Sequence, residues 1–224
     1  RSFRETTDSI SGSPNRRIKR HRAGGSNEQC ISIIRDGDQQ PALRFSGLSY
    51  PQQGGGSGGS VDAVMPLINE IQKIRAEGKP IISHVDQCCS AAYWIASQTD
   101  AIFADNLLSE VGSIGAYCEL YDERENKATG ARTIDVYAPQ SKDKNRSYRE
   151  ALDGNTELLE KELSEIVSQF IADVQAGRPG IKAEADGVMS GAVFSTAKAL
   201  ESGMVNGQAC LEDCIEIVYV RANS

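Results

Sequence analysis

Long apolar runs are the first thing that this 224-residue chain lacks. No stretch approaches the roughly 18–20 consecutive apolar residues that a membrane-spanning helix needs. The N-terminal residues also contain no apolar core of the kind found in a secretory signal. We therefore expect neither a membrane span nor secretion. The 39% hydrophobic content is ordinary for one sizeable folded domain.

Histidine is almost absent, because only His21 and His84 occur in the whole chain. His21 lies in a run of basic residues near the N-terminus. His84 lies inside a short apolar segment, where we expect it to pack in the core or point away from any reacting group. A serine nucleophile that relies on a histidine base is therefore not expected here.

The six cysteines do not suggest a metal centre. Cys88 and Cys89 are adjacent and look like small buried residues beside a helix start. Cys210 and Cys214 have no second pair of ligands close by, so a zinc site is not favoured. We expect a reducing compartment, in practice the cytoplasm, and we expect no cofactor. The remaining cysteines are Cys30 and Cys118.

Charge is unevenly distributed along the chain. The net charge is -7, but residues 1–22 carry about +5 and the remainder about -12. Residues 1–29 are polar and lack a sustained apolar period, so we predict a flexible basic arm. The cluster Arg16–Arg22 would suit nucleic acid or an acidic partner, although such runs are usually only solvated charge. The second region, 30–224, is predicted to be the folded domain.

Hydrophobic periodicity predicts alternating helices and strands in the folded region, which is typical of an α/β domain with a parallel sheet. Gly78 and Pro80 end the first predicted helix, and Gly177 and Pro179 end the longest one. The predicted strands are 31–34, 81–85, 101–104, 133–137 and 215–220, and the predicted helices begin near 61, 91, 155 and 196.

Ser90 is the strongest candidate for chemistry. It stands between the predicted strand 81–85 and an apolar helical run that begins at Ala91. A serine at such a turn can present its hydroxyl at the N-terminal end of a helix, where partial positive charge stabilises an oxyanion. The alternative is a serine that merely caps the helix.

With no suitable histidine, a lysine is the candidate base for Ser90. A buried lysine with a lowered pKa accepts a proton from serine, and Ser-Lys dyads perform the work of a triad. Lys142 and Lys144 follow a predicted strand about fifty residues after Ser90. The alternative for both is an ordinary solvated charge.

Four segments in order resemble the signal peptide peptidase A family, and in particular its bacteriophage capsid (prohead) protease branch. They are Ser57-Gly58-Gly59-Ser60-Val61, Cys89-Ser90-Ala91-Ala92-Tyr93-Trp94-Ile95-Ala96, Val111-Gly112-Ser113-Ile114-Gly115 and Ser141-Lys142-Asp143-Lys144-Asn145. The resemblance extends from about Ser57 to the C-terminus. It implies a Clp-protease/crotonase-like α/β fold, in which a parallel, spiralling sheet is flanked by helices.

The resemblance also implies roles for individual residues. Ser90 would be the nucleophile of a serine endopeptidase. Its base would be Lys144 by the match to the phage branch, which we favour, with Lys142 as the alternative by the match to the cellular branch. The oxyanion and substrate groups would come from Gly58, Gly59, Ala91, Gly112 and Ser113, and Ser113 is the fallback nucleophile. No metal is implied.

The implied substrate is an extended polypeptide, namely scaffold or capsid protein during phage head maturation, in the host cytoplasm or procapsid. Family members form homo-oligomeric rings, and in some of them an adjoining subunit supplies the base. One rival is a cellular peptidase that degrades signal peptides. The other is an inactive scaffold or assembly protein with a nucleic-acid-binding arm.

Residues 30–56 depart from the family pattern. The segment 43–53 is a poor central strand, because Pro51 and two glutamines disfavour burial. The glycine run 54–59 is alternatively a flexible linker, natural or engineered.

Overall fold

The computed structural model describes residues 6–8, 16–22, 29–36, 40–47, 61–122 and 124–223. They form two units. The sheet unit comprises Arg1–Gly115 and Phe170–Ser224, and the small unit comprises Ala116–Gln169. The elements in chain order are β1 Thr6–Asp8, β2 Arg16–Arg22, β3 Gln29–Asp36, β4 Gln40–Gly47, α1 Val61–Ala76, β5 Ile82–Val85, β6 Gln87–Cys89, α2 Ala91–Ala96, β7 Ala101–Ala104, β8 Glu110–Gly112, η1 Pro139–Ser141, α3 Arg146–Leu152, α4 Glu157–Gly177, β9 Val193–Ser195, α5 Thr196–Glu201, β10 Gly207–Gln208 and α6 Leu211–Ala222.

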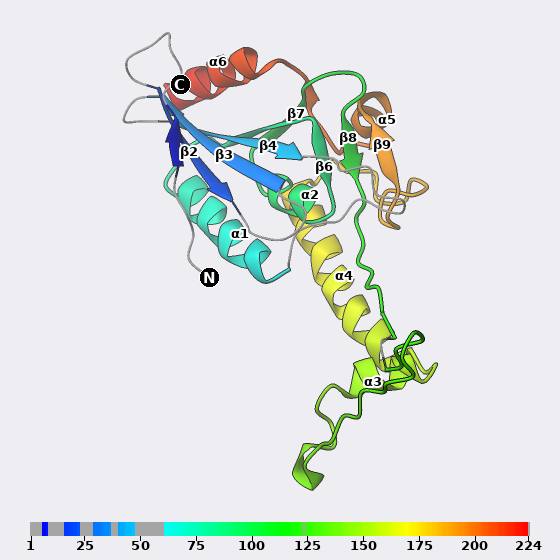
Figure 1. The fold of residues 1–224 in the computed structure, drawn as a ribbon. Coiled ribbons are helices and arrows are strands. Elements are labelled where there is room, and N and C mark those ends of the chain that lie inside the picture. Colours follow the sequence, from blue (N-terminus) through cyan, green and yellow to red (C-terminus); the bar gives the residue numbers. More distant parts are fainter. Residues whose placement is uncertain are drawn as a thin grey trace. The chain divides into compact units, whose positions relative to one another are not determined.

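A seven-stranded sheet in the order β1-β2-β3-β4-β5-β7-β10 forms the centre of the sheet unit. Strands β4, β5, β7 and β10 pair in parallel, whereas β1 to β4 form an antiparallel meander. Helices α1 and α6 lie on opposite sides of this sheet (Figure 1). A second sheet, β6-β8-β9, carries the candidate site. The expected α/β class is thus confirmed, while the Clp-protease/crotonase-like spiral stays a prediction.

Helix α1 forms as its sequence period predicts. Val64, Ile68 and Ile71 recur every three or four residues and are all buried. Residues at this spacing lie on one helix face, so the face packs inward while charged residues such as Lys73 remain in solvent. The predicted strands 81–85 and 101–104 are confirmed as β5 and β7, and the helices near 155 and 196 as α4 and α5.

The predicted closing strand 215–220 is wrong, because this segment lies within helix α6. The run of β-branched and aromatic residues favours a strand locally. Packing decides otherwise: Cys214 and Val218, four residues apart, bury one helix face against Ile82 and Ala101 of the sheet. Tertiary burial therefore overrides local propensity.

The N-terminal segments form more regular structure than their composition suggests. Strands β1 and β2 lie within the predicted arm and pair antiparallel. Strand β4 pairs with β3 on one side and β5 on the other, so 40–47 is a central strand. The prediction that 43–53 makes a poor central strand is therefore wrong for 43–47, which belong to β4. Pro51 and the two glutamines, on which it rested, are not part of β4 and lie outside the described residues. The domain division at residue 29 stays a prediction.

Helix α4 is joined to α2 by aromatic and polar contacts. The rings of Trp94 and Phe170 stack with centroids 4.6 Å apart. The indole N–H of Trp94 donates to Asp173 at 2.8 Å, and the Gln98 side-chain amide donates to the Asp173 carbonyl. At Gly177 a side chain would collide with the Ser97 carbonyl, which explains the glycine at the end of α4. The C-terminal turns of α4 therefore buttress the helix that follows Ser90.

The small unit has little regular structure beyond α3, η1 and the first turns of α4. The predicted strand 133–137 does not form, and the only bridge described nearby joins Glu125 to Arg132. Ile134 and Val136 are 81% and 89% exposed. The segment has strand-forming residues but no described strand beside it to complete a ladder. No described helix is both long and apolar enough to cross a membrane.

Candidate active site

Ser90 occupies a strained turn between β6 and α2. Its backbone dihedrals are φ 55° and ψ −127°, a conformation that a residue with a side chain rarely adopts. The Ser90 N–H donates to the Gly112 carbonyl at 2.8 Å, and the Ser90 carbonyl accepts from the Trp94 N–H at 3.0 Å. The surrounding backbone thus holds the turn from both sides.

The Ser90 hydroxyl does not cap helix α2, since no side-chain capping hydrogen bond is formed there. The side chain is half-buried. Backbone strain of this kind is found most often at functional positions. A capping hydrogen bond from the side chain therefore does not account for the serine at position 90.

The backbone of Gly112 contacts this turn, and the backbone of Ala192 contacts the residue after Gly112. Gly112 has φ +129°, and a side chain there would lie 2.5 Å from the Ala192 carbonyl oxygen. That same carbonyl accepts a hydrogen bond from the Ser113 N–H at 2.8 Å. Only glycine fits at position 112. In this conformation the Gly112 carbonyl accepts the hydrogen bond from the Ser90 N–H.

Ser113 lies beside Ser90 in the register of the second sheet. Strands β6 and β8 are parallel, with Cys89 opposite Gly112, so each serine is the next residue after a paired position. Ser113 also has a positive φ of 53° and is half-buried. The structure therefore brings together two serines in strained turns, and the sequence singled out both.

Helix α2 provides the electrostatics of the site. All six of its residues are buried, so it is firmly packed. The N–H groups of its first turn have no intrahelical acceptor, and that of Ala91 is the first. The Tyr93 hydroxyl donates to the Met204 carbonyl at 3.0 Å, and burial raises the pKa of this phenol. Gly58 and Gly59, the other expected oxyanion donors, lie outside the described residues.

His84 is occupied elsewhere, as the sequence suggested. It is buried in β5, and its Nε2 lies 3.0 Å from an Asp105 carboxylate oxygen just beyond β7. The imidazole therefore pairs with a carboxylate at the sheet.

The cysteines beside Ser90 are weak nucleophiles. Burial, with a contribution from the Glu110 carboxylate, raises the pKa of Cys89 to about 12. Burial also raises the pKa of Cys88. Free thiols are found at Cys88, Cys89, Cys118, Cys210 and Cys214. No group of three or more histidine, cysteine or acidic side chains in that part is arranged to hold a metal ion.

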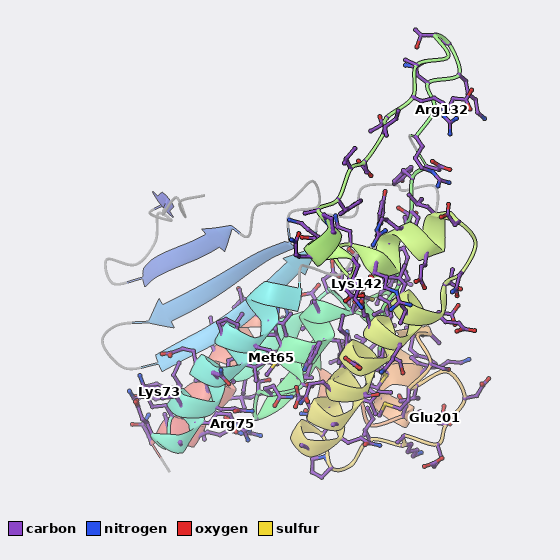
Figure 2. The ribbon with its side chains drawn as sticks, turned by 90° about the horizontal axis from the view of Figure 1, so that it is seen from below. Met65, Lys73, Arg75, Arg132, Lys142 and Glu201 are labelled. Carbon is purple, nitrogen blue, oxygen red and sulfur yellow. The ribbon has the colours of Figure 1, made fainter. Side chains whose placement is uncertain are left out.

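Both candidate lysines belong to the small unit and both are exposed. Lys142 follows η1, and Lys144 closes a turn in which its N–H donates to the Ser141 carbonyl at 3.1 Å. Figure 2 shows Lys142 near helix α3, and Arg132 in the loop of the small unit that extends away from this helix. Because Ser90 lies in the sheet unit, the pairing of Ser90 with a lysine stays a prediction.

Two residues have contacts that no sequence pattern indicated. The Ala192 carbonyl accepts a hydrogen bond from the Ser113 N–H and so orders the turn at Ser113, although the two residues are far apart in sequence. The Arg149 side chain donates to the Lys142 carbonyl, a contact that depends on the fold of the turn between them.

Residues 73–222 match the model of the family described as Peptidase family S49. Among solved structures, two mutants of the 1510-N membrane-bound stomatin-specific protease are similar to this chain. A serine-to-alanine mutant has 17% identity and a TM-score of 0.40, covering 71% of this chain and 63% of that one. A lysine-to-alanine mutant in complex with a substrate peptide has 18% identity and a TM-score of 0.39, covering 71% and 60%. The chain thus spans less than two thirds of that protease.

Proposed function

Because the chain belongs to peptidase family S49, a family of serine peptidases, we propose that it is a serine endopeptidase with Ser90 as nucleophile and a lysine from the turn 142–144 as base. The observation that carries the proposal is the Ser90 turn. Its backbone is strained and held on both sides, while its hydroxyl makes no capping hydrogen bond. A serine fixed in this way is ready for attack on a carbonyl.

The proposed reaction proceeds through an acyl-enzyme. Ser90 Oγ attacks the peptide carbonyl carbon, and its proton passes to the neutral lysine amine. The Ala91 N–H, at the positive end of α2, stabilises the tetrahedral oxyanion, with Gly58 or Gly59 as the proposed second donor. The lysine returns the proton to the leaving amine, and water then cleaves the ester by the same route. No step requires a metal or a nucleotide.

A lysine base must lose its proton near neutral pH, which requires that water be excluded around it. Both lysines are exposed in the single chain. We infer that a second copy covers this region in a homo-oligomer, as the family resemblance suggests. The exposed, strand-like segment that contains Ile134 and Val136 supports this inference, since such residues usually pair or pack.

The proposed substrate is an extended polypeptide that adds to a sheet edge by backbone hydrogen bonds. Processing of phage scaffold or capsid protein is the specific role we favour. Degradation of signal peptides by a cellular relative is the alternative. The two are distinguished by whether a capsid-type precursor or a free hydrophobic peptide is cut faster.

A second candidate function is an assembly protein that binds nucleic acid through Arg16–Arg22. The composition of this segment favours it, because five of its seven residues are arginine or lysine. Binding of duplex DNA that falls steeply with salt, and less steeply in Arg17→Gln, would support this function.

The peptidase proposal is tested by self-cleavage and casein cleavage with the purified protein. Ser90→Ala should abolish both activities, as should one of Lys142→Ala and Lys144→Ala. Ser164→Ala and Lys127→Ala, which alter an exposed serine and an exposed lysine outside the proposed site, are the matched controls. An inert wild-type oligomer contradicts the proposal and favours the assembly role. Full activity in Ser90→Ala contradicts Ser90 as the nucleophile and favours Ser113.

A further inference from the structure

Arg149 is the residue through which three parts of the small unit meet. It lies on α3, and its Nη2 donates to the Lys142 carbonyl at 2.6 Å. Its guanidinium carbon lies 4.5 Å from the centre of the Tyr137 ring. One side chain therefore ties the extended segment before η1, the lysine turn and the following helix together.

The other arginines near this turn are used differently. Arg146, on the same helix, is exposed and pairs with the Glu150 and Asp143 carboxylates. Arg124 is exposed and pairs with Asp122 and Asp153. No carboxylate of the described residues pairs with Arg149 in this way, and its Nε is buried without a hydrogen-bond partner.

An arginine held against a ring and a carbonyl restricts the backbone that it binds. A guanidinium is planar and rigid, so the bond to the Lys142 carbonyl and the stacking on Tyr137 fix one position of the turn. Lys144 receives no comparable support. The described contact of its backbone N–H is the bond to Ser141 within its own turn, which any residue would make.

We propose that Arg149 is a positioning residue that fixes Lys142, and that Lys142 rather than Lys144 is therefore the general base. This inference rests on the peptidase function proposed above. Positioning of a catalytic group contributes to turnover more than to substrate affinity, because it lowers the cost of reaching the reactive geometry.

The experiment compares casein-peptide kinetics of Arg149→Gln, Arg149→Lys and the matched variant Arg146→Gln from the same helix. Arg149→Gln should lower kcat by roughly 10- to 100-fold with little change in KM. Arg149→Lys should recover much of the loss, because an ammonium group can also bind a carbonyl and a ring. Arg146→Gln should keep wild-type kinetics, since the Arg146 side chain pairs with the Asp143 and Glu150 carboxylates and not with the Lys142 carbonyl.

Two further variants keep the test decisive. If Arg149→Gln does not fold, Tyr137→Leu removes the ring while Arg149 remains, and should lower kcat by roughly 3- to 10-fold. Adding Lys144→Ala should leave the size of the Arg149→Gln loss unchanged, whereas Lys142→Ala should leave nothing for Arg149→Gln to remove.

The outcomes separate the two proposals. An active wild type in which Lys142→Ala is also active, or in which Arg149→Gln and Tyr137→Leu match Arg146→Gln, overturns the role of Arg149 alone. An inert wild type overturns both proposals. A kcat loss confined to Arg149→Gln and Tyr137→Leu, with Lys142→Ala inactive, supports the assignment.

Discussion

The sheet unit and the small unit are built by different means. The sheet unit buries a continuous apolar core in which α1, α2 and α6 pack against the sheets. In the small unit Ala151 is the only buried apolar residue among those described, and its loops are tied by arginines such as Arg124 and Arg149. One unit is held by burial, and the other by polar contacts at its surface.

This difference shows which part of the candidate site is held in place by packing within a single chain. The Ser90 turn is fixed by buried neighbours whose conformations have few alternatives. The lysine turn is ordered locally by Arg149, but its surroundings remain open to solvent. We therefore expect substitutions in the sheet unit to change folding stability strongly, and those in the small unit to change catalysis or assembly more than stability.

The largest stability effect should come from Trp94→Ala. This change removes a buried ring that stacks on Phe170 and binds Asp173, so the free energy of unfolding should fall by about 3–5 kcal/mol. Urea denaturation measures it, with exposed Tyr219→Ala on α6 as the control. A loss below 1 kcal/mol would show that α4 does not buttress α2.

The rate of cysteine alkylation should differ between the two units. Because the Cys89 pKa is raised to about 12, its thiolate fraction at pH 8 is on the order of 10³-fold below that of an ordinary thiol. Alkylation with iodoacetamide and peptide mapping should therefore modify exposed Cys118 of the small unit well before Cys89. Raising the pH should increase the thiolate fraction and hence the rate at Cys89. Rapid modification of Cys89 at pH 7 would contradict the packing around Ser90.

Gly112→Ala should give an intermediate effect on stability together with a loss of activity. The residue has φ +129°, and the new methyl group would collide with the Ala192 carbonyl. Together these effects should lower the free energy of unfolding by about 1–3 kcal/mol and displace the hydrogen bond from the Ser90 N–H to the Gly112 carbonyl. Gly154→Ala in the small unit is the control, because its φ is also positive but its surroundings are open. Equal losses in thermal stability would indicate that the strained dihedral alone, and not the contact, matters.

The smallest effect should come from Arg124→Gln. Hydrogen bonding from Arg124 lowers the pKa of Asp122 to about 2 from its ordinary 3.8, but both groups are exposed. We expect Tm at pH 7 to fall by about 2 °C or less. Because the folded-state pKa is lowered, this contribution is present above about pH 4 and is lost as pH falls toward 2. A large Tm loss would mean that the small unit depends on this pair.

Periodicity and breaker residues predicted the elements whose packing is local or simple. Helix α1, strands β5 and β7 and the long helix α4 all follow from apolar spacing bounded by glycine and proline. The strand-turn-helix pattern likewise predicted the turn at Ser90 between a strand and a helix. These features depend on residues close together in sequence, which is why the sequence was sufficient for them.

Features that depend on distant partners were missed. The segment 215–220 of helix α6 was predicted to be a strand because it is rich in β-branched residues. The sequence could not show that Ile82 and Ala101 bury one face of this helix. The segment 133–137 has the composition of a strand, but no described strand lies beside it. The Gly112–Ala192 contact joins residues eighty positions apart. Lys144 was favoured as the base on the family match alone, because nothing in the sequence indicates the support that Arg149 provides to Lys142.

The most direct test of the central claim is to identify the residue that a fluorophosphonate probe modifies in the wild-type oligomer. The probe reports an activated serine without requiring knowledge of the substrate. Peptide mapping by mass spectrometry should place the adduct on Ser90, with no adduct on Ser113 and none at all in Ser90→Ala. Modification of Ser113, or of no serine, would contradict the account.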